Sequence, residues 1–518
     1  MKRRILTTFT LLLAALLTLA LVSCGPDGTE ETRAEETRAE ETTAETIEET
    51  TKGTMEKTTE DSGYSKGLLY RRENSGYSVI GIESPDRDII IPATHGGEPV
   101  TGIGDEAFKD CTGLTSITIP DGVTSIGRAA FAGCTGLFSI TIPDSVSRIG
   151  DSAFCRCTSL ESITLPFVEN THFKDIFDAG RVPASLKRVV ITKATSIGDW
   201  EFADCASLTS ITIPDGVTSI GDYAFKDCTT LTSITIPDSV TSIGDCAFKG
   251  CTILTSIAIP NSVTSIGEQA FRRCTSLKSI TLPFVGNTLN GSENTHFGYI
   301  FGAHSYNENS QYVPESLKEI VVTGATDIAQ YAFSDCIRLT TITLLDSVTG
   351  ICDAAFRGCT GLTSITVGNG VANIGDAAFY GCTHLTSVTV GNSVTSIGDQ
   401  AFKGCTGLAT ITLPDSVTSI GGSAFSGCTG LATITIPDSV TSIDSVLFMG
   451  CTGLTSITIP DSVASIGRSA CSGCKRLTSI SFKGTKAQWD AIYKGSYYDF
   501  GTGSYTVHCT DGDILVTY

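Results

Sequence analysis

The residues that could carry chemistry in this sequence are cysteines, histidines and many aspartates, serines and threonines. The 518 residues include 20 cysteines and six histidines. Fourteen of the cysteines occupy one position in successive copies of a short repeat: Cys111, Cys134, Cys157, Cys205, Cys228, Cys251, Cys274, Cys336, Cys359, Cys382, Cys405, Cys428, Cys451 and Cys474. Cysteines in such a pattern could form disulfides, hold a metal ion or serve as small apolar residues.

The spacing of these cysteines argues against disulfides and against a metal site. One cysteine per repeat would place the sulfur atoms in single file with parallel Cβ vectors, about 4.8 Å apart. A disulfide needs converging vectors and Cβ atoms about 3.8 Å apart. No histidine recurs beside the cysteines, and the Cys-x-x-Cys pair Cys471 and Cys474 has Cys471 where phenylalanine is usual. We therefore expect a buried ladder of free thiols, with no metal and no cofactor.

The remaining polar residues do not form a recognisable catalytic pattern. The histidines are scattered, and His172, His296 and His304 lie where the repeat is interrupted. Aspartate, serine and threonine recur because of the repeat, so a Ser-His-Asp triad would be a coincidence of their abundance. The aspartate spacing matches no calcium-binding loop. We predict that the protein is not an enzyme; the alternative is an enzyme whose site lies in the interruptions.

The element that positions these residues is a repeat of 22 or 23 residues. Its clearest copy begins at Leu231 and reads LTSITIPDSVTSIGDCAFKGCTI. Sixteen leucines open such units, at positions 114, 137, 160, 186, 208, 231, 254, 277, 317, 339, 362, 385, 408, 431, 454 and 477. A repeat this short cannot bury its apolar face alone, so its copies must stack into an elongated solenoid.

Each repeat predicts two strands and a turn. In the unit at Leu114, Ile117 and Ile119 alternate with hydroxyl residues, which indicates a half-buried strand. Pro120 ends this strand and begins a turn. Residues 123–127 give a second short strand, and the Ala-Phe-x-x-Cys segment closes the coil with a short helical or irregular turn. We therefore predict a mainly β solenoid of some seventeen coils with a parallel, in-register sheet, roughly 80 Å long.

The order Ile-x-Ile-Pro, Val-x-x-Ile-Gly and Ala-Phe-x-x-Cys resembles the BspA-type leucine-rich repeat of bacterial surface proteins. The resemblance covers roughly residues 76–485. It implies a leucine-rich-repeat solenoid, α/β by convention, that is displayed on the cell surface and binds matrix or serum proteins of a host or other bacteria. Residues 63–110 are then expected to form the N-terminal cap and first partial repeat, residues 111–482 the repeats, and residues 483–518 the C-terminal cap.

The start of the chain predicts export and a lipid anchor. Residues 1–23 combine a basic start with an apolar run, as a secretory signal peptide does. The run ends in Leu-Val-Ser-Cys, which resembles the bacterial lipobox, in which the cysteine, here Cys24, is diacylated. The alternatives are an ordinary signal peptide and a transmembrane helix, for which the run is short. We expect Cys24 to anchor the protein to a bacterial cell membrane.

An acidic segment follows the expected anchor. Residues 27–62 contain 13 acidic and four basic residues, a net charge of −9 out of −20 for the whole chain. This composition predicts that residues 24–62 form a disordered stalk. The acidic balance also argues against nucleic acid as a partner and against any membrane contact other than the lipid anchor.

Two islands interrupt the repeat, at residues 167–184 and 284–315. Both contain Thr-His-Phe followed by Ile-Phe, so their phenylalanines either fill the gap in the core or face a ligand. We favour the core for these phenylalanines, which are Phe173, Phe177, Phe297 and Phe301. The second island adds candidate ligand contacts, which are Tyr299, Tyr306 and Tyr312.

The coil after each island adds an apolar spot to the sheet. Val190 and Val321 stand where other coils have an outward threonine, so each island adjoins an apolar spot. The rows of outward serine and threonine are the other candidate face. We predict a surface lipoprotein whose solenoid binds extracellular proteins or glycans. The alternatives are a passive spacer and an ice-binding surface.

Replacement of Cys24 tests the anchor. Cys24→Ser removes the acceptor thiol, so we expect the protein to stay unprocessed or to be released from the membrane, without incorporating a lipid probe. Membrane fractionation with lipid labelling measures this. Equal labelling of the variant and the parent protein would contradict the prediction.

Overall fold

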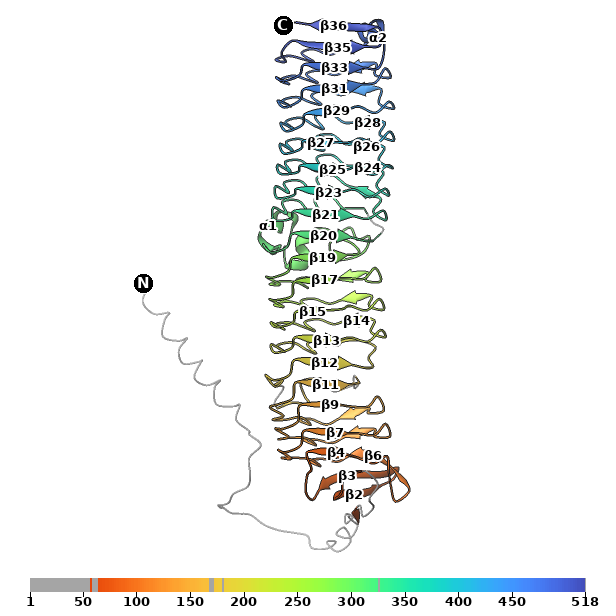
Figure 1. Cartoon of the computed structure of the whole chain (residues 1–518), viewed down its shortest axis with the longest axis vertical. Coiled ribbons are helices and arrows are strands. Elements are labelled where there is room, and N and C mark those ends of the chain that lie inside the picture. The colour runs from red at the N-terminus through yellow and green to blue at the C-terminus, as the bar shows by residue number, and fades with distance from the viewer. Residues whose placement is uncertain (1–55, 58–63, 167–171, 179–180, 325–326, 518) are drawn as a thin grey trace, which may run out of the picture. The chain divides into compact units, whose positions relative to one another are not determined.

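The computed structural model describes residues 56–57, 64–166, 172–178, 181–324 and 327–517. Cys24, the expected signal peptide and most of the expected stalk lie outside these residues. The described repeats form one solenoid, in which each coil contributes a strand to a front sheet and, in most coils, a strand to a back sheet (Figure 1). The predicted solenoid with parallel, in-register strands is confirmed.

The front sheet contains eighteen strands among the described residues, one more than expected. They are β4 (Asp88–Ile90), β7 (Ser116–Thr118), β9 (Ser139–Thr141), β11 (Ser162–Leu165), β12 (Arg188–Ile191), β13 (Ser210–Thr212), β15 (Ser233–Ile234), β17 (Ser256–Ala258), β19 (Ser279–Leu282), β20 (Glu319–Val322), β21 (Thr341–Leu344), β23 (Ser364–Thr366), β25 (Ser387–Thr389), β27 (Thr410–Ile411), β29 (Thr433–Thr435), β31 (Ser456–Ile459), β33 (Ser479–Phe482) and β35 (Tyr505–Cys509). We call the outward side of these strands the front face.

The strands of the back sheet are mostly two residues long, and this sheet is interrupted at both islands. Its strands are β6 (Glu98–Ile103), β8 (Ser125–Ile126), β10 (Arg148–Ile149), β14 (Ser219–Ile220), β16 (Ser242–Ile243), β18 (Ser265–Ile266), β22 (Gly350–Ile351), β24 (Asn373–Ile374), β26 (Ser396–Ile397), β28 (Ser419–Ile420), β30 (Ser442–Ile443), β32 (Ser465–Ile466) and β34 (Tyr493–Lys494). The front sheet, in contrast, pairs across each island: β11 with β12, and β19 with β20.

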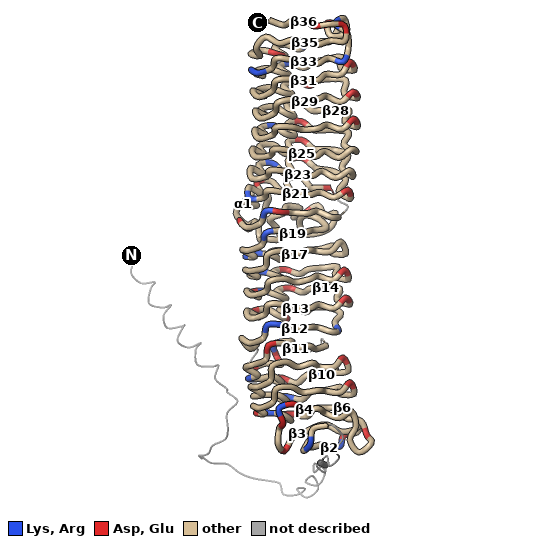
Figure 2. Tube along the Cα trace, in the orientation of Figure 1, with Lys and Arg blue, Asp and Glu red and all other residues tan. Residues whose placement is uncertain are grey.

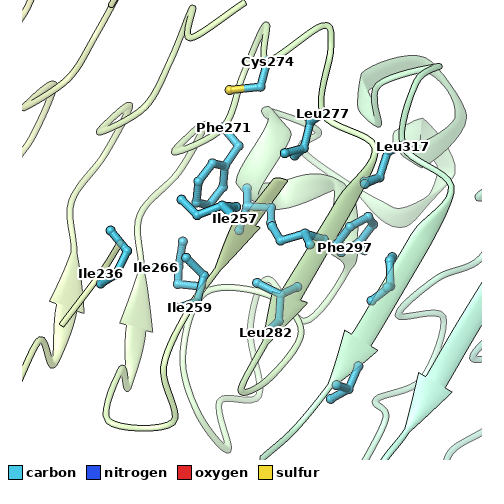
Figure 3. Close-up of a cluster of buried hydrophobic side chains, with 14 of the residues drawn as sticks. Ile236, Ile257, Ile259, Ile266, Phe271, Cys274, Leu277, Leu282, Phe297 and Leu317 are labelled. Carbon is cyan, nitrogen blue, oxygen red and sulfur yellow. The ribbon is translucent and has the colours of Figure 1, made fainter. Parts of the chain in front are cut away.

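The core runs through the solenoid as columns of identical side chains. Figure 3 shows Ile257, Phe271 and Leu282 pointing inward between the two sheets. Phenylalanine rings of successive coils stack on one another, for example Phe108 on Phe131 with 5.5 Å between centroids and 7° between planes. Each buried side chain of this size contributes about 1.5–3 kcal/mol relative to an exposed one, so the columns carry most of the apolar stabilisation.

Recurrent polar residues also stack, and they explain the repeated Gly-Asp. The carboxylate of Asp199 accepts a hydrogen bond from the backbone N–H of Asp222, at 2.8 Å, and Asp222 does the same for Asp245, at 2.7 Å. The preceding glycine is required by close approach, since a Cβ at Gly221 would lie 2.3 Å from Asp199 Oδ1. These aspartates therefore join neighbouring coils.

The fourteen repeat cysteines form the expected ladder of buried, unpaired thiols. Cys134 Sγ donates to the carbonyl oxygen of Phe108 at 3.1 Å, and the next cysteines repeat this contact. Burial raises the pKa of the Cys157 and Cys205 thiols to about 12. Since the thiolate is the reactive form, these cysteines are protected by both burial and protonation.

Both ends of the solenoid carry additional elements. At the N-terminal end, β2 (Leu68–Glu73) and β3 (Gly76–Ile82) form an antiparallel pair, and β3 continues the back sheet next to β6. The short strand β5 (Thr94–His95) pairs with β6. Residues 56–57 were expected in the disordered stalk, but they form β1 (Glu56–Lys57) beside β2, because β2 offers a free strand edge there.

The C-terminal end is covered by α2 (Lys486–Ala491) and β36 (Gly512–Val516). A capping box formed by Thr485 and Gln488 starts the helix. Trp489 is buried against Phe482, with 5.3 Å between ring centroids. The tryptophan therefore closes the end of the core, as a terminal cap must.

Thiol counting tests the ladder. We expect the folded protein to resist alkylation at the fourteen repeat cysteines, and the denatured protein to expose at least a dozen reactive thiols without added reductant. The reason is that burial makes these thiols inaccessible, and it raises the pKa of thiols such as Cys157. Mass spectrometry after alkylation gives the count, and a value near zero in the denatured, unreduced protein would mean disulfides.

Candidate binding surface

The first island restores the core column that the repeat pattern lacks there. The N–H of Phe154 donates to the carbonyl of Ile176 at 2.7 Å, as Phe131 does to Ala153 in the preceding coil. Ile176 and Phe177 thus replace the usual Ala-Phe. Phe173 lies between Phe177 and Phe202, with ring centroids at 5.3 and 4.8 Å.

The second island does the same with short helices, η1 (Phe297–Phe301), η2 (Tyr306–Glu308) and α1 (Asn309–Tyr312). Phe297 is fully buried between Phe301 and Phe333, with ring centroids at 5.2 and 5.1 Å, and Figure 3 shows it beside the core strands. The phenylalanines of both islands therefore belong to the core, as favoured from the sequence.

Buried polar side chains fix each island to the next coil. Glu201 stands where most coils have alanine, and it is buried; its Oε1 accepts from the N–H of Phe173 at 2.6 Å, and its Oε2 lies 3.2 Å from His172 Nδ1. Burial raises the pKa of Glu201, against the lowering effect of these contacts. In the second island, buried Asn309 accepts from Gly298 N–H at 2.8 Å and donates to the Ser334 carbonyl at 2.8 Å.

The three candidate tyrosines do not converge on one point. Tyr306 is half-buried and stacks on Tyr331, with 4.3 Å between centroids and 11° between planes. Tyr312 packs against the core, and its ring lies 5.8 Å from the guanidinium carbon of Arg272. Tyr299 lines a hollow of about 430 Å³ on the back sheet, and burial raises its pKa. Tyr306 is thus the candidate that is best placed to contact a partner.

The two candidate valines lie on the front face in different coils. Val190 pairs with Thr164 and Thr212, and Val321 takes the same position five coils later. Five coils correspond to about 24 Å at the spacing of strands in a sheet, so no small ligand touches both. Each valine marks its own apolar spot.

Charged residues join the valines on the front face, and the sequence-based prediction did not include them. Lys187 and Arg188 precede Val190, and Lys318 and Glu319 precede Val321, where other coils mostly have serine or threonine. Figure 2 shows these charged residues in blue on β12 and in blue and red on β20, whereas most strands of the front face are tan. Comparing the repeat position by position would have revealed them.

After each island, an aromatic residue occupies the position of the turn where the backbone has a left-handed conformation. Trp200 has φ 60° and Tyr331 has φ 58°. Trp200 stacks on Tyr223 at 4.0 Å, with Lys226 Nζ 5.5 Å from its ring, and Tyr331 stacks on Tyr306. Stacked aromatic pairs therefore lie beside both islands; Trp200 is exposed, and Tyr223, Tyr306 and Tyr331 are half-buried.

A hollow of about 650 Å³ lies at the carboxyl ends of β21, β23 and β25. In these coils the usual proline after the strand is replaced by Leu345, Gly368 and Gly391. Leu345 is exposed at its edge, and Asn369 N–H donates to Asp346 at 2.7 Å within its lining. The sequence analysis did not predict this hollow, although the absence of proline from three successive coils could have indicated it.

We define the second-island surface as Tyr306, Tyr331, Lys318, Glu319 and Val321 together with the hollow. These parts lie in successive coils, because β20, β21, β23 and β25 pair in sequence. Figure 1 shows α1 at the edge of the solenoid beside β20. Among the residues that the structure describes, no group of three or more His, Cys, Asp or Glu side chains is placed to hold a metal ion.

The sequence matches the family described as the BspA type leucine rich repeat region, at residues 88–194, 195–300, 307–429 and 372–499. The chain belongs to the BspA-type leucine-rich repeat family. None of the curated proteins matches the chain significantly. Leucine-rich repeat proteins of this kind commonly bind other proteins or act at the cell surface.

Solved structures of bacterial leucine-rich repeat proteins are similar to this BspA-type chain. One from Bacteroides ovatus ATCC 8483 is 29% identical over 86% of this chain and 98% of its own, with a TM-score of 0.36. A leucine rich cell surface protein from Faecalibacterium prausnitzii A2-165 is 29% identical over 85% and 97%, with a TM-score of 0.30. The T. pallidum leucine rich repeat protein is 29% identical over 35% and 85%, with a TM-score of 0.30.

In this BspA-type chain the regular coils and the islands have different roles in the fold. The regular coils repeat one set of contacts, whereas the islands retain the core position of the repeat and add new surface groups. In the described part of the chain, no helix is both long and apolar enough to cross a membrane. The second-island surface combines several of these departures from the repeat.

Truncation of Phe297 tests the core role of the second island. Phe297→Ala should lower the free energy of unfolding by about 3 kcal/mol, because it empties a fully buried ring position between two others. Urea unfolding measures the change. Tyr306→Ala is the control, since Tyr306 is half-buried and should change stability much less; equal stabilities of the two variants would refute the assignment.

Proposed function

We propose that this protein is a lipid-anchored cell-surface protein that binds an extracellular protein through the second-island surface, and so attaches the cell to a host or to other cells. The observation that carries the proposal is that more departures from the repeat lie in the coils from β19 to β25 than around the first island. The island helices, the charged and apolar positions of the front face and the proline-free hollow all lie there.

The chemistry of this surface supports a protein partner. Protein interfaces combine aromatic and apolar anchors with a polar rim, and aromatic residues carry much of the binding energy. The stacked pair of Tyr306 and Tyr331 supplies the aromatic area, and Leu345 supplies an exposed apolar edge. Lys318 and Glu319 supply both charges within one strand.

The regular front face offers less to a partner. Its rows of serine and threonine are uniform from coil to coil, and many of these hydroxyls lie in contact with water, for example Ser116 and Thr118. Uniform rows give no single register for a folded partner, whereas an irregular surface does. We therefore place binding at the irregular coils.

The anchoring part of the proposal rests on the sequence. Cys24 and the acidic residues that follow it lie outside the described residues, and the N-terminal elements β2 and β3 form one end of the solenoid. The second-island surface lies on coils between the two ends of the solenoid, away from β2 and β3 (Figure 1). Such an arrangement suits a protein that contacts targets outside the cell.

A binding screen with the full-length protein tests the function. Extracellular-matrix proteins, serum proteins and glycans are immobilised separately, and saturable binding to a protein is the expected result. Saturable binding to glycans alone would redirect the proposal to a carbohydrate ligand. No saturable binding to any of them would instead support a passive spacer.

Substitution of Tyr306 tests the location of the site. Tyr306→Ala should weaken binding by about 1 kcal/mol or more while leaving the unfolding midpoint nearly unchanged, because this half-buried ring contributes contact area. Surface plasmon resonance with the partner found in the screen measures the change.

Two matched variants serve as controls for that experiment. Tyr380→Ala removes a half-buried tyrosine outside the second-island surface, and Thr458→Val changes a regular position of the front face. Both should bind normally. Normal binding by Tyr306→Ala together with lost binding by Thr458→Val would place the site on the regular sheet instead.

A further inference from the structure

The two islands share the sequence Thr-His-Phe, but its histidine has a different environment in each. In the first island His172 is exposed, with 69% of its side chain accessible to solvent, and its Nδ1 lies 3.2 Å from the carboxylate of Glu201. In the second island His296 is buried, with an exposed fraction of 7%. Among the described residues, neither ring nitrogen of His296 has a hydrogen-bond partner. Only the first histidine therefore has a place for a positive charge.

A difference in the following coil accounts for this contrast. Glu201 in the coil after the first island corresponds to Ala332 in the coil after the second, since each directly precedes the phenylalanine of the core column. The N–H of Phe173 donates to the Glu201 carboxylate at 2.6 Å, whereas the N–H of Phe297 donates to the backbone carbonyl of Ala332 at 2.7 Å. The second island thus keeps the anchoring hydrogen bond but lacks the carboxylate.

The surroundings of His296 favour its neutral form. Its ring lies edge-on to that of Tyr299, with 6.3 Å between centroids. Burial lowers the pKa of His296, against the raising effects of Asn309 and Glu308, and a positive charge on His304 adds to the lowering. These groups come from η1, α1, η2 and the loop before η2, which are the elements of the island itself. A charge on the buried ring is therefore poorly compensated.

The sign of the pH effect follows from this lowering. Because the pKa of His296 in the closed island lies below its ordinary value of 6.5, an island that exposes the ring to water binds the proton more readily. The closed form is fully favoured above about pH 6.5 and loses stability as the pH falls below that value.

His296 also lies where the helices of the island begin. Its carbonyl accepts from the N–H of Tyr299 at 3.2 Å, which starts η1. Asn309 of α1 accepts from the N–H of Gly298 at 2.8 Å, so α1 is attached to the same turn. Tyr306 precedes Asn309 by three residues and depends on this attachment for its position. Outward rotation of the histidine would therefore disturb both helices.

We propose that the second island is an acid-sensitive element, which opens when His296 gains a proton and turns out of the core. Opening loosens η1 and α1 and removes Tyr306 from its stacking position on Tyr331. The regular coils and the first island keep their structure, because stability in a solenoid is close to local. Release of a bound partner on acidification is a further consequence, and only this step rests on the proposed function.

Hydrogen exchange of the full-length protein, followed by mass spectrometry at about pH 7.5 and about pH 5.5, tests the opening. Exchange times are scaled for the intrinsic pH dependence of amide exchange. We expect peptides covering residues 297–312 to lose protection by ~3-fold or more at the lower pH. Peptides covering residues 172–178 provide the internal control and should keep their protection.

Variants assign the effect to one side chain. His296→Phe and His296→Gln cannot be protonated in this pH range, so either of them, once folded at the higher pH, should keep residues 297–312 protected at the lower pH. His172→Gln and His304→Gln are the matched controls and should respond like the parent protein. Equal protection of the parent at both pH values would overturn the proposal. So would an acid response that persists in both His296 variants, or one that only His304→Gln removes.

Binding measurements separate this inference from the proposed function. With the protein partner found in the screen, we expect the dissociation constant to rise by ~3-fold or more between the two pH values for the parent but not for His296→Phe. Acid-induced loss of protection without any change in binding would support the acid-sensitive island and contradict the proposed site. A pH-dependent affinity that is the same in His296→Phe would contradict control of binding by this histidine.

Discussion

Backbone hydrogen bonds between neighbouring coils hold this solenoid in register, and every other feature depends on that register. Phe108 donates to the carbonyl of Ala130, and Phe131 donates to that of Ala153, so each coil repeats the contact one step further along. Because equivalent residues lie directly above one another, a column of like side chains is the stable solution. Phenylalanine rings stack, thiols form a file, and the aspartate carboxylates each bind the next backbone N–H.

The same constraint determines what an island can change. An island must return its chain to the register of the next coil, so it keeps Ile-Phe in place of Ala-Phe and keeps the front strands paired across it. The back strand and the outer loop are free to vary, because fewer contacts depend on them. New polar anchors then become necessary, and Glu201 and Asn309 supply them from buried positions.

Repetition explains how much of the structure could be predicted. The strands, the cysteine ladder and the core role of Phe297 followed from the spacing, because each column is sampled many times in the sequence. The stacking of Tyr306 on Tyr331 could not be predicted, since it depends on the path of an island that occurs once. The hollow beside Leu345 was predictable only in part. The sequence shows that proline is missing from these coils, but only the structure shows that a hollow lies there.

Because each coil contacts mainly its neighbours, stability in such a solenoid is close to a sum over coils and their interfaces. A substitution on the second-island surface therefore has little effect on the distant C-terminal end, and the reverse also holds. An island and an end of the solenoid can therefore change independently. The ends remain special, because only there does a coil lack a neighbour to pair with its backbone. At the N-terminal end Ser65 supplies hydrogen bonds to β4 from within the chain, and at the C-terminal end β36 pairs with β35.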